Sequence, residues 1–149
     1  KLKEYIYLFS FGSKNHPFCA PFMINLKGTL DISLMQQGVA LMEGEHDYRN
    51  YAYKSTPETQ TVMTIESASI EKNTLYTANF FPETSYIFKV TGAGFKRHQV
   101  RLMMGALFDL GSGKMSLFDF EKSLDGEIPF TLTHIAQASG LILQRVTLD

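Results

Sequence analysis

The sequence has one cysteine and no long apolar run. Cys19 cannot form an internal disulfide, and its apolar neighbours are typical of a buried, reduced thiol. No run approaches the roughly 20 apolar residues that a bilayer-spanning helix needs. The first residues lack the basic, apolar and small-residue regions of a signal peptide. These absences exclude a disulfide scaffold and predict a cytoplasmic protein with no membrane partner.

The sequence also has little net charge and no internal repeat, low-complexity tract or linker. Its 149 residues are 44% hydrophobic and 19% charged, with a formal net charge of -1. A chain of this length buries roughly 70% of the surface that it exposes when unfolded, so it needs no metal or disulfide to hold a core. We therefore expect a single domain over residues 1–149.

Hydrophobic periodicity predicts an α+β fold with a largely antiparallel sheet and helices packed on one face. Aromatic and β-branched residues alternate over 4–11, and Tyr5 and Tyr7 share one face of that strand. Further strands are expected over 62–72, 76–81, 86–91 and 141–148, and the first three of these are expected to form a meander. Helices are expected over 32–43, after an Asp31 N-cap, and over 95–110. A short helix over 117–124 is expected after a capping box formed by Ser116 and Asp119. The loop from Gly12 to Gly28 carries no assignment.

Cations gather at the start of the helix expected over 95–110. Lys96, Arg97, His98 and Arg101 fall in its first two turns, where the helix dipole disfavours positive charge. One interpretation is a site that binds an anion such as phosphate or a carboxylate. The alternative is a solvated basic surface paired with nearby glutamates. The net charge near zero disfavours a nucleic-acid partner only on average, because these cations are concentrated locally.

Other chemical motifs fail on inspection. The segment 111–114 lacks the further residues of a phosphate-binding loop, since Phe108 and Met115 stand where Gly and Ser or Thr are required. The acidic and histidine residues over 43–47 have no second ligand cluster, so no metal site is predicted. No serine lies in a Gly-x-Ser-x-Gly elbow, and Cys19 has no neighbouring base. The sequence therefore shows no self-contained catalytic constellation.

Three segments together resemble the tRNA pseudouridine synthase A family. Gly44-Glu45-His46-Asp47-Tyr48-Arg49-Asn50-Tyr51 resembles its G-E-H-D-F-x-x-F motif. Residues 94–107, GFKRHQVRLMMGAL, resemble its G-F-x-x-x-x-V-R-x-x-V-G-A-L helix, and residues 136–143, AQASGLIL, resemble its A-x-A-x-G-L-x-L segment. The three motifs occur in the family's order and spacing across nearly the whole chain.

The resemblance implies an enzyme that isomerises uridine to pseudouridine in the tRNA anticodon stem-loop. The family works as a homodimer without a metal or organic cofactor. Its catalytic aspartate belongs to a G-R-T-D-x-G-V-H motif in the first half of the protein, which this sequence does not contain. The resemblance, with a first residue Lys1 that is not methionine, therefore implies a C-terminal half that is inactive alone, with no catalytic residue of its own.

The resemblance also assigns roles by position. Tyr5 is expected to pack against the target base and to take part in proton transfer. Arg101 is expected to pair with the absent aspartate, and Leu141 to line the uracil pocket.

Three further positions, Lys96, Arg97 and His98, are expected to contact the RNA backbone. The competing hypothesis is a non-catalytic RNA-binding or dimerisation module. It follows from the basic segment and the missing nucleophile.

Overall fold

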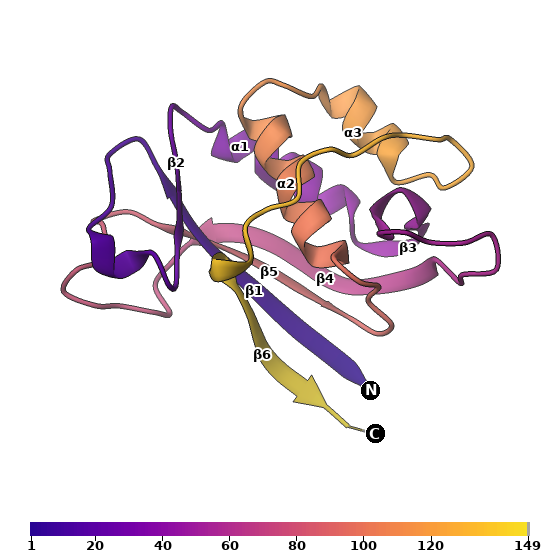
Figure 1. Cartoon of the computed structure of the whole chain (residues 1–149), viewed down its shortest axis with the longest axis horizontal. Coiled ribbons are helices and arrows are strands. Elements are labelled where there is room, and N and C mark those ends of the chain that lie inside the picture. Colours follow the sequence, from indigo (N-terminus) through magenta and orange to yellow (C-terminus); the bar gives the residue numbers. More distant parts are fainter. Residues whose placement is uncertain (149) are drawn as a thin grey trace.

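One six-stranded sheet organises the computed structural model, which describes residues 1–148, and the helices lie on one side of it (Figure 1). The strands are β1 (Leu2–Phe11), β2 (Ile24–Leu26), β3 (Gly44–Asp47), β4 (Val62–Lys72), β5 (Tyr86–Gly92) and β6 (Leu141–Thr147). Their order is β2-β1-β5-β4-β3, and β6 also pairs with β1. Every pairing except β1 with β2 is antiparallel. This confirms the α+β fold with a largely antiparallel sheet.

Three α-helices cover the sheet: α1 (Ile32–Leu41), α2 (Gln99–Gly111) and α3 (Leu117–Ser123). The expected caps are confirmed, because the Asp31 side chain accepts a hydrogen bond from the Leu34 N–H at 3.0 Å and Ser116 accepts one from the Asp119 N–H at 3.1 Å. Short 3-10 turns lie over Pro17–Cys19, Arg49–Tyr51 and Ala138–Gly140. No helix within residues 1–148 has the length and hydropathy to cross a membrane.

The alternation of β1 places side chains in two apolar layers. Tyr7 and Phe9 face α2, where both rings meet the Phe108 ring edge-on, at centroid distances of 6.0 and 5.2 Å. Ile6 and Leu8 face the other side, in a smaller cluster with the buried Cys19. Burial raises the pKa of that thiol, and its Sγ donates to the Phe80 carbonyl. The central strand is thus buried on both faces, and the buried position expected for Cys19 is confirmed.

The strand expected over 76–81 is wrong. After β4 the chain enters a loop that the Asn73 side chain organises: its Oδ1 accepts from the N–H groups of Leu75 and Tyr76, and its Nδ2 donates to Tyr76 O and Ser85 Oγ. A side chain that satisfies local backbone groups competes with a strand ladder. β4 and β5 therefore form a hairpin with a long connection, and the predicted three-stranded meander does not form.

Two short strands have no counterpart in the expectations. β3 pairs with the start of β4 and begins at Gly44, whose φ of +94° turns the chain out of α1. β2 pairs in parallel with the end of β1, inside the loop from Gly12 to Gly28. Strands of three or four residues carry too little alternation to show a period of two.

Candidate functional site

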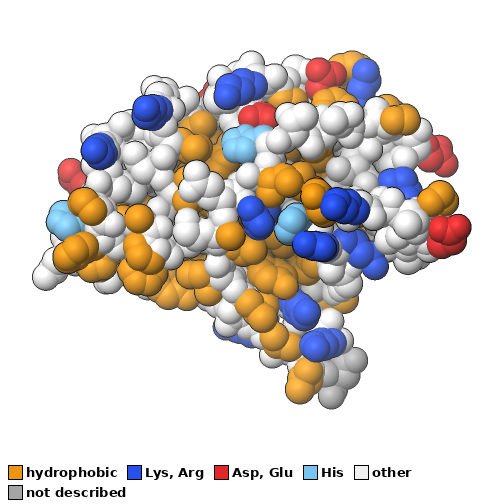
Figure 2. Space-filling view, viewed as in Figure 1, with side chains coloured by type: hydrophobic (Ala, Val, Ile, Leu, Met, Phe, Trp, Pro, Cys, Tyr) orange, Lys and Arg blue, Asp and Glu red, His pale blue; other side chains and the backbone are white. Residues whose placement is uncertain are grey.

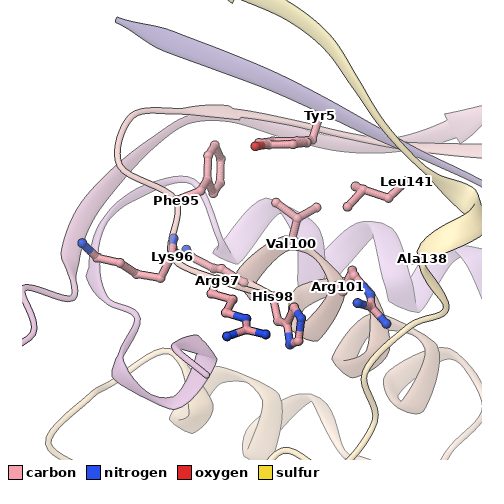
Figure 3. Close-up of a pocket in the computed structure, with 10 residues that line it drawn as sticks. Tyr5, Phe95, Lys96, Arg97, His98, Val100, Arg101, Ala138 and Leu141 are labelled. Atoms are coloured by element: carbon pink, nitrogen blue, oxygen red, sulfur yellow. Dashed lines mark hydrogen bonds between the residues drawn. The ribbon is translucent and has the colours of Figure 1, made fainter. Parts of the chain in front are cut away.

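A pocket of about 410 Å³ lies where β1, the start of α2 and the start of β6 meet (Figure 3). It brings together all six candidate residues of the sequence: Tyr5, Lys96, Arg97, His98, Arg101 and Leu141. Four further lining residues were not singled out from the sequence: Phe95, Gln99, Val100 and Ala138. Their positions inside two of the family-like motifs were the available signal.

One side of the pocket is apolar. The Tyr5 ring meets the Phe95 ring edge-on, with centroids 5.3 Å apart and planes at 90°. Val100 on α2 and Leu141 on β6 continue this surface, as Figure 3 shows. The period of β1 explains the position of Tyr5, because it points to the same face as Tyr7, whose hydroxyl donates to Gln137 O in the core. Of these two tyrosines, Tyr5 therefore lines the pocket and Tyr7 lies in the core.

The opposite side of the pocket carries the cations. The prediction that their helix begins at residue 95 is wrong. α2 begins at Gln99 rather than at residue 95, so Lys96, Arg97 and His98 lie in the loop before it. His98 has φ of 61°, a left-handed conformation that prevents the helix from extending back to residue 95. The buried Gln99 side chain then accepts a hydrogen bond from the Lys96 N–H at 2.9 Å, which fixes the loop.

The surroundings of His98 disfavour the positively charged form of its imidazole. Burial lowers the pKa of its imidazole below the ordinary 6.5, and the positive charges of Arg101 and Arg97 lower it further. Its ring lies 4.7 Å from the Tyr53 ring, and the Arg97 guanidinium lies 5.7 Å from the same ring. The buried Nδ1 of His98 has no hydrogen-bond partner within residues 1–148.

Arg101 is oriented by the segment that leads to β6. Its Nε donates to the Ala136 carbonyl at 2.7 Å, and the Ala136 N–H donates to the Arg101 carbonyl at 3.1 Å. The segment approaches α2 this closely because residue 105 is glycine: a Cβ there would lie 1.8 Å from the His134 carbonyl oxygen. No Asp or Glu lines the pocket, and within residues 1–148 no carboxylate forms an ion pair with Arg101.

The charge distribution on the surface follows the same arrangement. Figure 2 shows Lys, Arg and His side chains gathered over the start of α2, with apolar side chains below them toward β1 and β6, while the acidic side chains of this view lie apart from this cluster, toward the top and the sides. The net charge of -1 therefore hides a local excess of positive charge around the pocket.

The motif over residues 44–51 lies outside the pocket and stabilises a neighbouring loop. Asn50 Nδ2 donates to the carbonyls of Ser123, Asp125 and Ile128, and its Oδ1 accepts from the Phe130 N–H. Asp47 accepts from the Arg49 N–H and from the Thr61 hydroxyl. Within residues 1–148 no three His, Cys, Asp or Glu side chains come close enough together to hold a metal ion.

A protein-family model described as tRNA pseudouridine synthase matches residues 39–149. The chain belongs to the tRNA pseudouridine synthase family. It is 29% identical over 147 residues to tRNA pseudouridine synthase A of Ligilactobacillus salivarius, covering 99% of this chain and 55% of that protein. The enzymes of the same name from Streptococcus mutans and Staphylococcus aureus are each 26% identical, with 99% of this chain and 56% and 52% of those proteins covered.

The chain therefore spans about half the length of the curated synthases that it matches. The pocket described above lies within the part that the synthase model covers, apart from Tyr5 on β1.

Proposed function

We propose that residues 1–149 form the C-terminal domain of a tRNA pseudouridine synthase that isomerises uridine in the anticodon stem-loop. In this proposal the domain binds RNA and completes the active site, while the catalytic aspartate belongs to an N-terminal half. The domain alone is inactive, and the full-length protein acts as a cytoplasmic homodimer. The match to synthases of about twice this length supports a second half.

The chemistry of the reaction makes specific demands on a pocket. Uridine and pseudouridine differ in the uracil atom bonded to the ribose, which is N1 in the first and C5 in the second. The base must leave the stack, detach, turn and rejoin the sugar, and a proton must leave C5. A flipped base is held by an aromatic face and an apolar wall. Tyr5, Val100 and Leu141 supply such surfaces, and a volume of about 410 Å³ leaves room for the base to turn.

The observation that carries the proposal is the position of Arg101 in a pocket without acidic residues. A partly buried guanidinium is poorly solvated, and its planar donors fit a carboxylate bidentately. Its Nε is already bound to Ala136 O, which leaves its terminal nitrogens for a partner from outside the described residues. A catalytic aspartate placed there stays ionised, because the adjacent positive charge lowers its pKa.

The outer edge of β6 supports the same division of the protein. β6 pairs with β1 alone among the described strands, and Leu143 and Val146 on it are 48% and 42% exposed. An uncovered strand edge with apolar side chains is an aggregation hazard. In the proposal the other half of the enzyme covers this edge.

The test is to replace Arg101 in the full-length protein and to measure pseudouridine in tRNA anticodon arms. Arg101→Ala removes both the positive charge and the planar pair of donors, and we expect turnover to fall about 100-fold or more. Arg101→Lys keeps only the charge and should lose less. Lys114→Ala removes a cation outside the pocket and is the matched control. Unchanged turnover in Arg101→Ala would contradict the role of Arg101.

The competing module hypothesis makes a different forecast for the same protein. A full-length protein that binds tRNA but forms no pseudouridine with wild-type Arg101 would establish a binding module. For residues 1–149 alone we expect no isomerisation, together with weak tRNA binding that falls as salt rises, because counterions are released from the RNA. Sedimentation of the full-length protein tests the homodimer.

A further inference from the structure

The Tyr53 ring joins two loops beside the candidate pocket. The centroid of the His98 ring lies 4.7 Å from the centroid of the Tyr53 ring, with the planes at 47°. The Arg97 Cζ atom lies over the Tyr53 ring at 5.7 Å from its centroid, and Lys54 Nζ lies over it at 5.3 Å. Arg97 and His98 belong to the loop 93–98 before α2, whereas Tyr53 and Lys54 belong to the loop 52–61 before β4. One aromatic ring therefore contacts cations of both loops.

The loop that carries Tyr53 is held in place by the rest of the protein. The Arg49 guanidinium donates to the Thr56 and Thr59 carbonyls, each at 3.0 Å, so its planar donors are used within this loop. Tyr51, two residues before Tyr53, is fully buried, and Tyr53 itself is half-buried against the main core. The core and Arg49 therefore fix where the ring lies.

Two unusual backbone conformations meet at this ring. Within residues 1–148, Lys54 and His98 are the only non-glycine residues with positive φ, at 52° and 61°. A left-handed conformation is unfavourable for a residue with a Cβ, and such residues cluster at functional sites. Lys54 directly follows Tyr53 in the chain, and His98 contacts the ring from the other loop. The fold therefore retains two unfavourable turns whose side chains lie against one aromatic ring.

The cations beside Tyr53 have an aromatic partner in place of a carboxylate. Within residues 1–148 none of Lys54, Lys96 and Arg97 forms an ion pair. The face of an aromatic ring attracts a cation within about 6 Å of its centroid, and the planar Arg guanidinium also stacks on such a face. Arg97 lines the pocket, as Figure 3 shows, whereas Tyr53 does not. The ring is therefore placed to hold Arg97 at the edge of the pocket without contacting a base inside it.

We propose that Tyr53 is a positioning residue for RNA binding, because its ring holds Arg97 and His98 at the edge of the pocket before the RNA arrives. The inference rests on the proposed function and adds a residue that acts through those two side chains rather than on the RNA itself. A long side chain that is free in solution loses rotamer freedom when it binds a phosphate, whereas one already held by a ring loses less. Tyr53 therefore raises RNA affinity by preorganisation.

The test measures tRNA binding by the full-length protein across a salt series, with a thermal melt of each variant. Tyr53→Leu removes the aromatic face but keeps an apolar side chain against the core, and we expect Kd to rise about fivefold. Tyr53→Phe keeps the face and should bind as the wild type does. The matched control is Phe118→Leu, which removes an exposed ring on α3 with Lys122 Nζ 4.4 Å from its centroid. That pair lies outside the pocket, so its loss should leave Kd unchanged.

A double-mutant cycle separates positioning from a merely structural role. In a protein that already carries Arg97→Ala and His98→Gln, the ring has neither side chain left to position, so Tyr53→Leu should raise Kd by less than about twofold further. NMR of the free wild-type protein gives a second measurement, which decides the question even if Tyr53→Leu unfolds. Without RNA, the ring current of Tyr53 should already shift the Arg97 side-chain protons upfield from their values in an unstructured peptide.

The outcomes distinguish this inference from the proposed function. Three results would each overturn the positioning role: a wild-type Kd in Tyr53→Leu, a loss of about fivefold that persists without Arg97 and His98, or Arg97 protons at unstructured-peptide shifts. Binding is measured without turnover, so loss of isomerisation in Arg101→Ala tests the proposed function separately. A full-length protein that binds no tRNA would overturn both.

Discussion

Gly105 lets two distant segments build the candidate pocket, and replacing it with alanine tests that coupling. A Cβ at this position would lie 1.8 Å from the His134 carbonyl oxygen and 2.7 Å from its carbonyl carbon. Both are backbone atoms, so no rotamer change relieves the clash. The segment 132–136 must move away from α2 by more than 1 Å to reach ordinary van der Waals distance, about 3.5 Å or more.

The expected cost follows from what that movement breaks. Two hydrogen bonds join Arg101 to Ala136, and each contributes about 1 kcal/mol. Ala136 is 1% exposed, and separating it and its apolar neighbours from α2 costs about 1–2 kcal/mol of burial. Alanine in a helix interior returns about 1 kcal/mol relative to glycine. The net loss of unfolding free energy is about 2–3 kcal/mol.

Thermal and denaturant unfolding of the full-length protein measure this change, with Gly38→Ala as the matched control. Gly38 also lies in a helix, but the atom nearest to its added Cβ is a methyl group of the Leu110 side chain, which can rotate. We expect the control to lose clearly less stability than Gly105→Ala, and to keep its RNA affinity. If the two variants were equally stable, or if Gly105→Ala bound RNA like the wild type, the coupling between the segment and the pocket would be refuted.

Three further predictions concern single side chains. NMR titration of the free protein should give His98 a pKa below 6.5, and an RNA phosphate beside the ring should raise it. RNA affinity should therefore increase as pH falls from 7.5 toward 6. A flat pH profile of RNA affinity that matches the profile of His98→Gln would contradict the contact. Its lowered pKa also means that its contribution to folding stability is complete above 6.5 and is lost as pH falls through the folded-state pKa. Tyr5→Phe keeps the ring against Phe95 and should retain RNA affinity while turnover falls about 100-fold, as for a lost proton-transfer group, whereas equal turnover would assign Tyr5 to packing alone. Asn50→Ala removes the donor to the carbonyls of Ser123, at the end of α3, and of Asp125 and Ile128 in the loop after it, and should cost about 1–3 kcal/mol of stability in a melt, with RNA affinity unchanged. Weakened RNA binding by a folded variant would place Asn50 in the site.

The sequence predicted the elements whose periodicity is long and whose caps are local. β1, β4, β5, β6 and α1 lie within a few residues of their expected ranges, because seven or more alternating or helical positions outweigh the noise of single residues. It failed where one side chain controls the backbone. Asn73 turns a strand-like run into a loop by four hydrogen bonds, and no periodicity shows which asparagine will do so.

The start of α2 shows how the same limitation affected the site. Helical spacing extends back to residue 95, which put Lys96, Arg97 and His98 into a helix whose dipole disfavours them. The left-handed His98 and the Gln99 side chain delay the start of the helix to residue 99, so these cations avoid the unfavourable first turn and lie along a loop beside the pocket. Arg101 alone remains in the first turn, where its positive charge is unfavourable by some tenths of a kcal/mol unless an anion accompanies it. The loop conformation therefore separates the three cations for which we propose contacts to an RNA backbone from the one cation for which we propose a carboxylate partner.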